Sequence, residues 1–186
     1  MKIKGSFFIT TKTAMIEVFG EEVWNSFMTR LAEKDNYFKN VIMSINLIPV
    51  EKFIVIFDEI CKELFNSDYS QYSTFGKVGA KYALSPEGPY KSYLLSKDIK
   101  QFVDFALPKL WATYFDGGVC TTKLENNIVH FKVTGVQFKH LYFEQLLMGY
   151  FQKAIKVFGK KTVAKQVKSL VAGDGELYFQ YALKDA

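Results

Sequence analysis

The sequence predicts a mixed α+β fold: a helical N-terminal half packed on a roughly four-stranded antiparallel sheet, with a central helix between two hairpins. Apolar residues recur at helical spacing as far as about Asp116, and two alternating segments follow, centred on residues 126–127 and 172–175. Between them, residues 137–158 are apolar around most of a helix. The 186 residues, 49% of them hydrophobic, can bury a sizeable core, so we expect a single domain over 1–186.

The first helices are predicted from periodic apolar residues. Residues 8–19 and 21–34 form two helices separated at Gly20, and residues 40–46 form a short strand or a loop. Pro49 suits the first turn of a third helix, because its missing N–H would have no partner there. The apolar stripe of that helix is Val50, Phe53, Ile54, Phe57, Ile60, Cys61 and Leu64.

Two further helices carry residues that helices normally avoid. Residues 70–84 contain Gly76 and Gly79 on nearly one face, which indicates close approach by another helix or by a ligand, and we favour the helix. Residues 97–115 contain Pro108, which should remove one backbone hydrogen bond and kink the helix.

The first hairpin is predicted to its register. Asn126 and Asn127 tolerate the positive φ of a two-residue turn. That turn places Cys120 opposite Val133 on the apolar face and Lys123 opposite His130 on the polar face. We therefore expect Cys120 to point inward and His130 outward.

The central helix is predicted over residues 137–158, with a narrow polar stripe. His140 lies on that stripe one turn before Glu144, which indicates a solvent-facing pair. Residues 162–171 and 176–183 complete the sheet.

Composition excludes several classes of protein. Two cysteines, no signal-type leader and no long apolar run indicate a cytoplasmic protein without a transmembrane segment. Arg30 is the single arginine, which argues against specific nucleic-acid binding. A basic patch at Lys160, Lys161, Lys165 and Lys168 could meet an acidic partner or an anionic membrane. No phosphate loop, nucleophile elbow or paired histidines are present, so the residues predict no catalytic site, no metal and no cofactor.

Short motifs spread over nearly the whole chain carry a resemblance. They are Lys4-Gly5, Phe19-Gly20-Glu-Glu-Val23, Ile48-Pro49 before a helix ending Ile56-Phe57, Val78-Gly79, and Tyr142-Phe143-x-x-Leu146-x-x-Gly149. In their order and spacing the chain resembles the superfamily of haem-NO-binding domains, 4-vinyl reductase domains and TRAPP vesicle-tethering subunits. The resemblance implies that fold and a buried cavity.

The departures from that family bear on function. The resemblance implies a proximal histidine on the helix of residues 97–115, near Pro108–Trp111, but that helix has none. The family's Tyr-x-Ser-x-Arg motif for haem propionates matches Val133, Gly135 and Gln137 here. The cysteine cluster of many 4-vinyl reductase domains is missing as well. We therefore interpret the chain as a haem-less member.

The sequence thus indicates a non-enzymatic ligand-binding or sensor module for a small hydrophobic molecule. Pro108 should bend one wall of the pocket, while Gly79 and Gly149 should remove bulk from two others. The predicted ligand-binding residues are Gly79, Phe102, Leu107, Leu110, Trp111, Tyr142, Leu146 and Gly149. One alternative is an interaction scaffold that forms a homodimer around a filled core, and another is an enzyme, suggested only by the vinyl-reductase resemblance.

Overall fold

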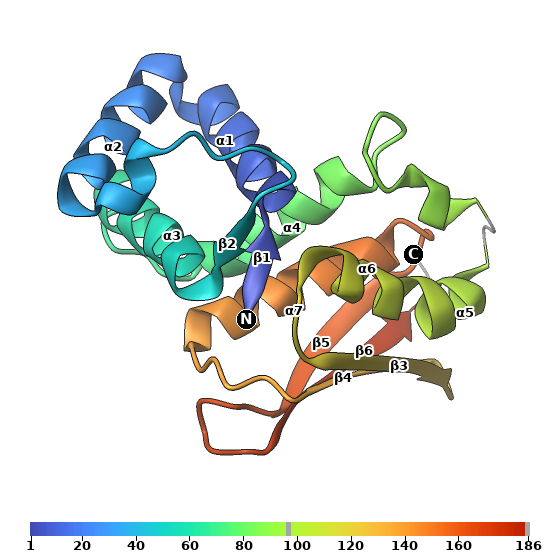
Figure 1. Cartoon of the computed structure of the whole chain (residues 1–186). Coiled ribbons are helices and arrows are strands. Elements are labelled where there is room, and N and C mark those ends of the chain that lie inside the picture. The colour runs from blue at the N-terminus through green and yellow to red at the C-terminus, as the bar shows by residue number, and fades with distance from the viewer. Residues whose placement is uncertain (96–97, 185–186) are drawn as a thin grey trace. The chain divides into compact units, whose positions relative to one another are not determined.

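The computed structural model describes residues 1–95 and 98–184 and has the expected mixed α+β composition (Figure 1). The chain divides into two compact units. One spans Lys2–Tyr69, and the other holds Met1 and the chain from Ser70 onward. The expectation of a single domain over 1–186 stays a prediction.

The unit Lys2–Tyr69 combines a short strand pair with three α-helices. Its elements are β1 (Lys2–Lys4), α1 (Gly5–Phe19), α2 (Glu21–Lys34), a 3-10 turn (Asn36–Lys39), β2 (Leu47–Pro49) and α3 (Val50–Leu64). The predicted break at Gly20 and the helix after Pro49 are confirmed, and residues 40–46 form a loop. Strands β1 and β2 pair antiparallel, with Ile3 opposite Ile48.

Aromatic rings fill the interior of this unit. The ring of Phe53 on α3 lies 5.4 Å from Phe7 and 4.9 Å from Phe57, both edge to face. At the surface, Arg30 donates through Nε to Glu63 Oε2 at 2.9 Å. The single arginine therefore joins α2 to α3, and the expectation that the chain does not bind nucleic acid specifically stays a prediction.

The second unit contains a four-stranded antiparallel sheet in the order β3-β4-β6-β5. Its elements are α4 (Gln71–Ala83), a 3-10 turn (Lys91–Leu94), α5 (Ile99–Gln101), a π-helix (Phe102–Ala106), α6 (Leu107–Tyr114), β3 (Val119–Glu125), β4 (Ile128–Thr134), α7 (Leu141–Lys156), β5 (Lys161–Lys168) and β6 (Glu176–Lys184). Helix α7 connects the β3–β4 and β5–β6 hairpins, so the predicted sheet and its connection are confirmed (Figure 1). No described helix has the length and hydropathy to cross a membrane.

The β3–β4 hairpin has the predicted register. Asn126 and Asn127 have φ values of 49° and 60°, as a two-residue hairpin turn requires. Cys120 pairs with Val133 and is buried, while Lys123 pairs with His130. Local turn chemistry and alternation were sufficient to fix this register, because a shift by one residue would expose the entire apolar face.

The helix predicted over 97–115 is built from three segments, two α-helical and one π-helical, and residue 97 lies outside the described residues. Between α5 and α6 the chain forms a π-helix, in which the Leu107 N–H donates to the Phe102 carbonyl. Pro108 lies in the first turn of α6, where the N–H it lacks is least needed. A change of helical pitch therefore accommodates the proline without ending the helix.

Helix α7 begins four residues later than predicted. His140 caps it, because its Nδ1 accepts the Phe143 N–H at 3.1 Å. The predicted solvent-facing pair of His140 and Glu144 is wrong. The Glu144 side chain is 2% exposed and accepts from Gln166 Nε2 and, at 3.3 Å, from the Val171 N–H. These donors replace the water that a buried carboxylate loses.

Helices α4 and α7 touch through their backbones. A Cβ atom added at Gly76 would lie 2.0 Å from the Leu146 carbonyl oxygen, and one added at Gly149 would lie 2.2 Å from that of Ser73. The preferred interpretation of Gly76, close packing of a second helix, is confirmed. The expectation that Gly149 leaves space in a pocket wall is wrong, because α4 occupies that space.

This contact predicts that alanine destabilises the protein at Gly76 and Gly149 but not at a glycine outside the contact. Gly76→Ala and Gly149→Ala should each lower the free energy of unfolding by about 1–3 kcal/mol, since the helices must separate to admit a methyl group. That loss should outweigh the better helix propensity of alanine, which is about 1 kcal/mol. Gly175→Ala is the matched control, because nothing lies within 4 Å of its added Cβ. Urea unfolding measures all three, and equal midpoints would rule out the backbone contact.

The buried carboxylate gives a second prediction. Glu144→Ala should lower the free energy of unfolding by about 1–3 kcal/mol, because Gln166 and the Val171 N–H lose their acceptor. Amide hydrogen exchange should also speed up over residues 169–173. The control is Glu87→Ala, at an exposed turn. Unchanged exchange in the Glu144 variant would mean that the carboxylate does not hold this turn.

Candidate functional site

All eight predicted ligand-binding residues lie in the second unit, on three helical segments. Gly79 is on α4, Phe102 is on the π-helix, and α6 supplies Leu107, Leu110 and Trp111. Helix α7 supplies Tyr142, Leu146 and Gly149. All are buried except Tyr142, which is half-buried. They lie on apolar helix faces, and the ligand site that they were expected to form stays a prediction.

The structure spreads these residues along α7 and does not gather them around one point. Phe102 packs near the C-terminal end of α7, where its ring lies 4.7 Å from that of Phe158. Tyr142 is in the first turn of α7, and its ring lies 5.6 Å from Tyr72. A helix rises about 21 Å from Tyr142 to Lys156. The two ends of the predicted site are therefore separate environments.

A ring cluster occupies the N-terminal end of α7. It consists of Trp111, Phe115, Phe138 and Phe143, with Trp111 stacked on Phe115 at 4.2 Å and Phe143 edge-on to Phe115 at 5.9 Å. The Trp111 Nε1–H donates to the Gly117 carbonyl at 3.1 Å, which fixes the indole. The cluster is apolar, and the hydrogen bond of Trp111 is already made within the turn after α6.

A buried tyrosine pair joins the C-terminal end of α6 to α7. Tyr150 Oη donates to Tyr114 Oη at 3.1 Å, and the two rings pack edge to face at 5.6 Å. Burial raises the pKa of both phenols, so both remain neutral hydroxyls. Sequence reasoning placed both residues on apolar stripes and missed their pairing. The available signal was that a tyrosine on a buried stripe needs a partner for its hydroxyl.

The two cysteines are buried and are not activated as nucleophiles. Burial raises the pKa of the Cys61 thiol to about 12 and also raises that of Cys120, so both stay protonated. His130 Nδ1 lies 2.6 Å from Tyr178 Oη, on the sheet face away from Cys120. Among residues 1–95 and 98–184, no group of three or more histidine, cysteine or acidic side chains could hold a metal ion.

Comparison with known proteins identifies the fold. No family model and no curated protein matches the sequence. Among solved structures, a triple mutant of an H-NOX protein from S. oneidensis in the Fe(II) ligation state matches with a TM-score of 0.76 and 14% identity, covering 98% of this chain and 97% of that chain. The H-NOX domain from Shewanella oneidensis in the Fe(II)CO state gives 0.75 and 15%, covering 99% and 100%. The Fe(II) unliganded H-NOX protein from K. algicida gives 0.70 and 14%, covering 99% and 98%. The chain therefore has the fold of H-NOX domains, the haem-NO-binding fold that its short motifs predicted.

Proposed function

We propose that the chain is a non-enzymatic ligand-binding or sensor module for a small hydrophobic molecule, and that it works without haem. The observation that carries the proposal is the apolar face of α6 and α7, which holds one buried polar pair, Tyr114 and Tyr150. Small-molecule sites commonly combine apolar walls with a few polar groups that orient the ligand. Of the eight predicted residues, all but Gly149 would contribute to the walls, and the tyrosine hydroxyls would be the polar anchor.

Solved relatives of this fold support a sensor role and raise the question of haem. They include H-NOX proteins in Fe(II)NO and Fe(II)CO states and one used to probe heme distortion in the H-NOX family. Haem iron is held by donors such as histidine, cysteine thiolate or tyrosine. A haem-binding member of this fold would therefore need such a side chain next to the iron.

The side chains near α6 do not suit haem iron. Residues 98–116 contain no histidine, and the ligand region implied by the resemblance holds Leu110 and Trp111. Tyr114 is a buried neutral phenol bonded to Tyr150, and Cys120 is a buried neutral thiol. In His140 the Nδ1 atom accepts the Phe143 N–H, which leaves the proton of the neutral ring on Nε2, and in His130 the Nδ1 atom is hydrogen-bonded to Tyr178. This donor chemistry supports a haem-less module.

A second candidate is an interaction scaffold that forms a homodimer. Its specific support is the tight packing of α4 on α7 at Gly76 and Gly149, which fills part of the predicted pocket wall. Light scattering distinguishes the two, because a scaffold should be a stable dimer at low concentration while a binding module need not be.

Hemin titration tests the absence of haem. We expect no sharp Soret band at one equivalent of hemin, and no difference between the natural protein and its His130→Ala and His140→Ala variants. A sharp band that either substitution abolishes would show that haem is bound through that histidine and would end this part of the proposal.

Binding of an uncharged fluorescent probe tests the hydrophobic site. Nile red should gain fluorescence with the natural protein and lose most of that gain with Leu110→Trp, because the larger side chain fills the face between α6 and α7. The control is Leu141→Trp, since Leu141 is 44% exposed. If both variants bind Nile red as the natural protein does, the site is not on this face. Native mass spectrometry of protein from its host should then be examined for any apolar ligand carried elsewhere.

A further inference from the structure

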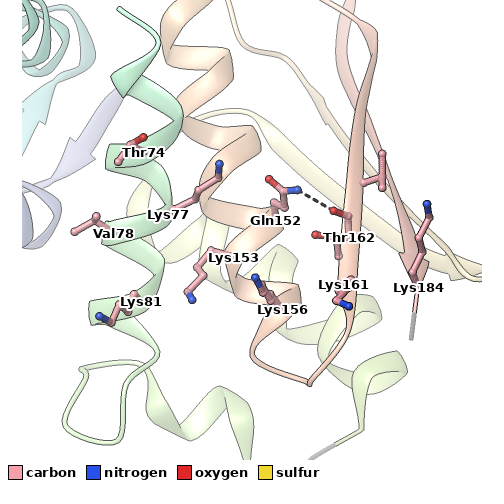
Figure 2. A pocket seen from close by; sticks show the side chains of 11 residues that line it. Thr74, Lys77, Val78, Lys81, Gln152, Lys153, Lys156, Lys161, Thr162 and Lys184 are labelled. Carbon is pink, nitrogen blue, oxygen red and sulfur yellow. Dashed lines mark hydrogen bonds between the residues drawn. The ribbon is translucent and has the colours of Figure 1, made fainter. Parts of the chain in front are cut away.

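A pocket lined largely by lysines lies among α4, α7 and the β5–β6 hairpin, all within the second unit (Figure 2). Its volume is about 660 Å³. The lining residues are Thr74, Lys77, Val78, Lys81, Gln152, Lys153, Lys156, Lys161, Thr162, Val163 and Lys184. None of the eight predicted ligand-binding residues belongs to it. Of the basic patch expected from sequence, Lys161 alone lines this pocket, and Lys168 instead pairs with Glu176 at 2.9 Å.

The pocket concentrates positive charge that the described part of the chain leaves uncompensated. Six of its lining residues are lysines, and none of its lining residues is acidic. Within residues 1–95 and 98–184, none of these six lysines forms an ion pair. Figure 2 shows that these lysines come from both helices and from the two strands. A concave surface carrying one sign of charge attracts ions of the other sign.

The six lysines form three like-charge pairs, each at a spacing that opposes folding. Lys77 and Lys81 are four residues apart on α4, and Lys153 and Lys156 are three apart on α7. Like charges at these spacings destabilise a helix. Lys161 and Lys184 are directly opposite each other on β5 and β6. Like charges in such a cross-strand pair are also unfavourable.

Helix dipoles explain only part of this arrangement. Lys81, Lys153 and Lys156 lie in the last turns of their helices, where a cation is favourable. Lys77 is a turn earlier, and the strand residues Lys161 and Lys184 gain nothing from a helix end. A local conflict that folding does not reward is expected at functional sites.

We propose that this pocket binds a small organic anion bearing two or more phosphate groups. The lysines would supply point charges to the phosphates. Gln152, whose Nε2 donates to the Thr162 carbonyl at 3.1 Å, and the threonine hydroxyls provide polar walls. Val78 and Val163 provide apolar contact for the organic part. Binding of the anion would reduce the charge repulsion within all three lysine pairs.

The pocket volume favours a small molecule over an acidic protein. About 660 Å³ lies within the usual range for small-molecule sites, about 300–1,000 Å³. The charges also converge from three directions on one hollow, whereas an extended acidic segment would need a track of basic residues. The proposal is independent of the hydrophobic site, since the two share no residue.

Tripolyphosphate is a suitable probe because it carries the required charge without the organic part. Isothermal titration should give one site per chain, and Lys153→Gln/Lys161→Gln should weaken binding roughly tenfold. The same variant should unfold at a higher temperature than the natural protein in the absence of the probe, because two repulsive pairs are relieved. Tripolyphosphate should raise the melting temperature of the natural protein, and sodium sulfate at equal ionic strength should raise it less.

The matched control is Lys39→Gln/Lys139→Gln, which removes the same charge from exposed positions outside the pocket. It should bind tripolyphosphate within about twofold of the natural protein. If both double variants lose the same affinity for tripolyphosphate, the loss reflects net charge alone and the proposal is overturned. Absence of measurable binding would also overturn it. Tighter binding of poly-glutamate than of tripolyphosphate, lost in the pocket variant, would assign the surface to an acidic protein instead.

Discussion

The backbone contact between α4 and α7 is the constraint on which the second unit depends. Gly76 and Gly149 each face a carbonyl of the other helix at a distance that admits no side chain. Because the helices approach this closely, Lys77 and Lys81 on one come to line the same pocket as Lys153 and Lys156 on the other. The contact also sets α7 beside the sheet, so that the apolar face toward α6 and the lysine pocket lie on different sides of one helix.

Polar groups inside this unit are placed where their hydrogen bonds can be completed. The Glu144 carboxylate accepts from Gln166 and from the Val171 N–H, so it ties α7 to the strand β5 and the turn that follows. Tyr114 and Tyr150 satisfy each other between two helices. Burying a polar group without a partner is costly, so these bonds fix which helix faces can meet. They also mark the places where an apolar interior could hold a ligand in one orientation.

The chain has the fold of H-NOX domains but a different set of side chains where that fold's chemistry would be expected. Residues 98–116 carry no histidine, and the ring cluster around Trp111 holds its own indole bond. A shared fold does not by itself carry a shared function, because function depends on the groups at the site. The second unit carries an apolar helix face with a neutral tyrosine pair and, apart from it, a pocket lined by lysines and by no acidic residue.

The sequence by itself determined the features that depend on near neighbours. The alternation around Asn126 and Asn127 fixed the register of the first hairpin, and periodicity placed the helices and the burial of Cys120. The start of α7 was set too early because propensity does not reveal that His140 serves as a cap. The sequence predicted that Glu144 faces solvent, because its hydrogen-bond partners, Gln166 and Val171, are more than twenty residues away in the chain. The lysine pocket was decided only by tertiary structure, since packing brings α4 against α7 and the last two strands, which lie far from α4 in the chain.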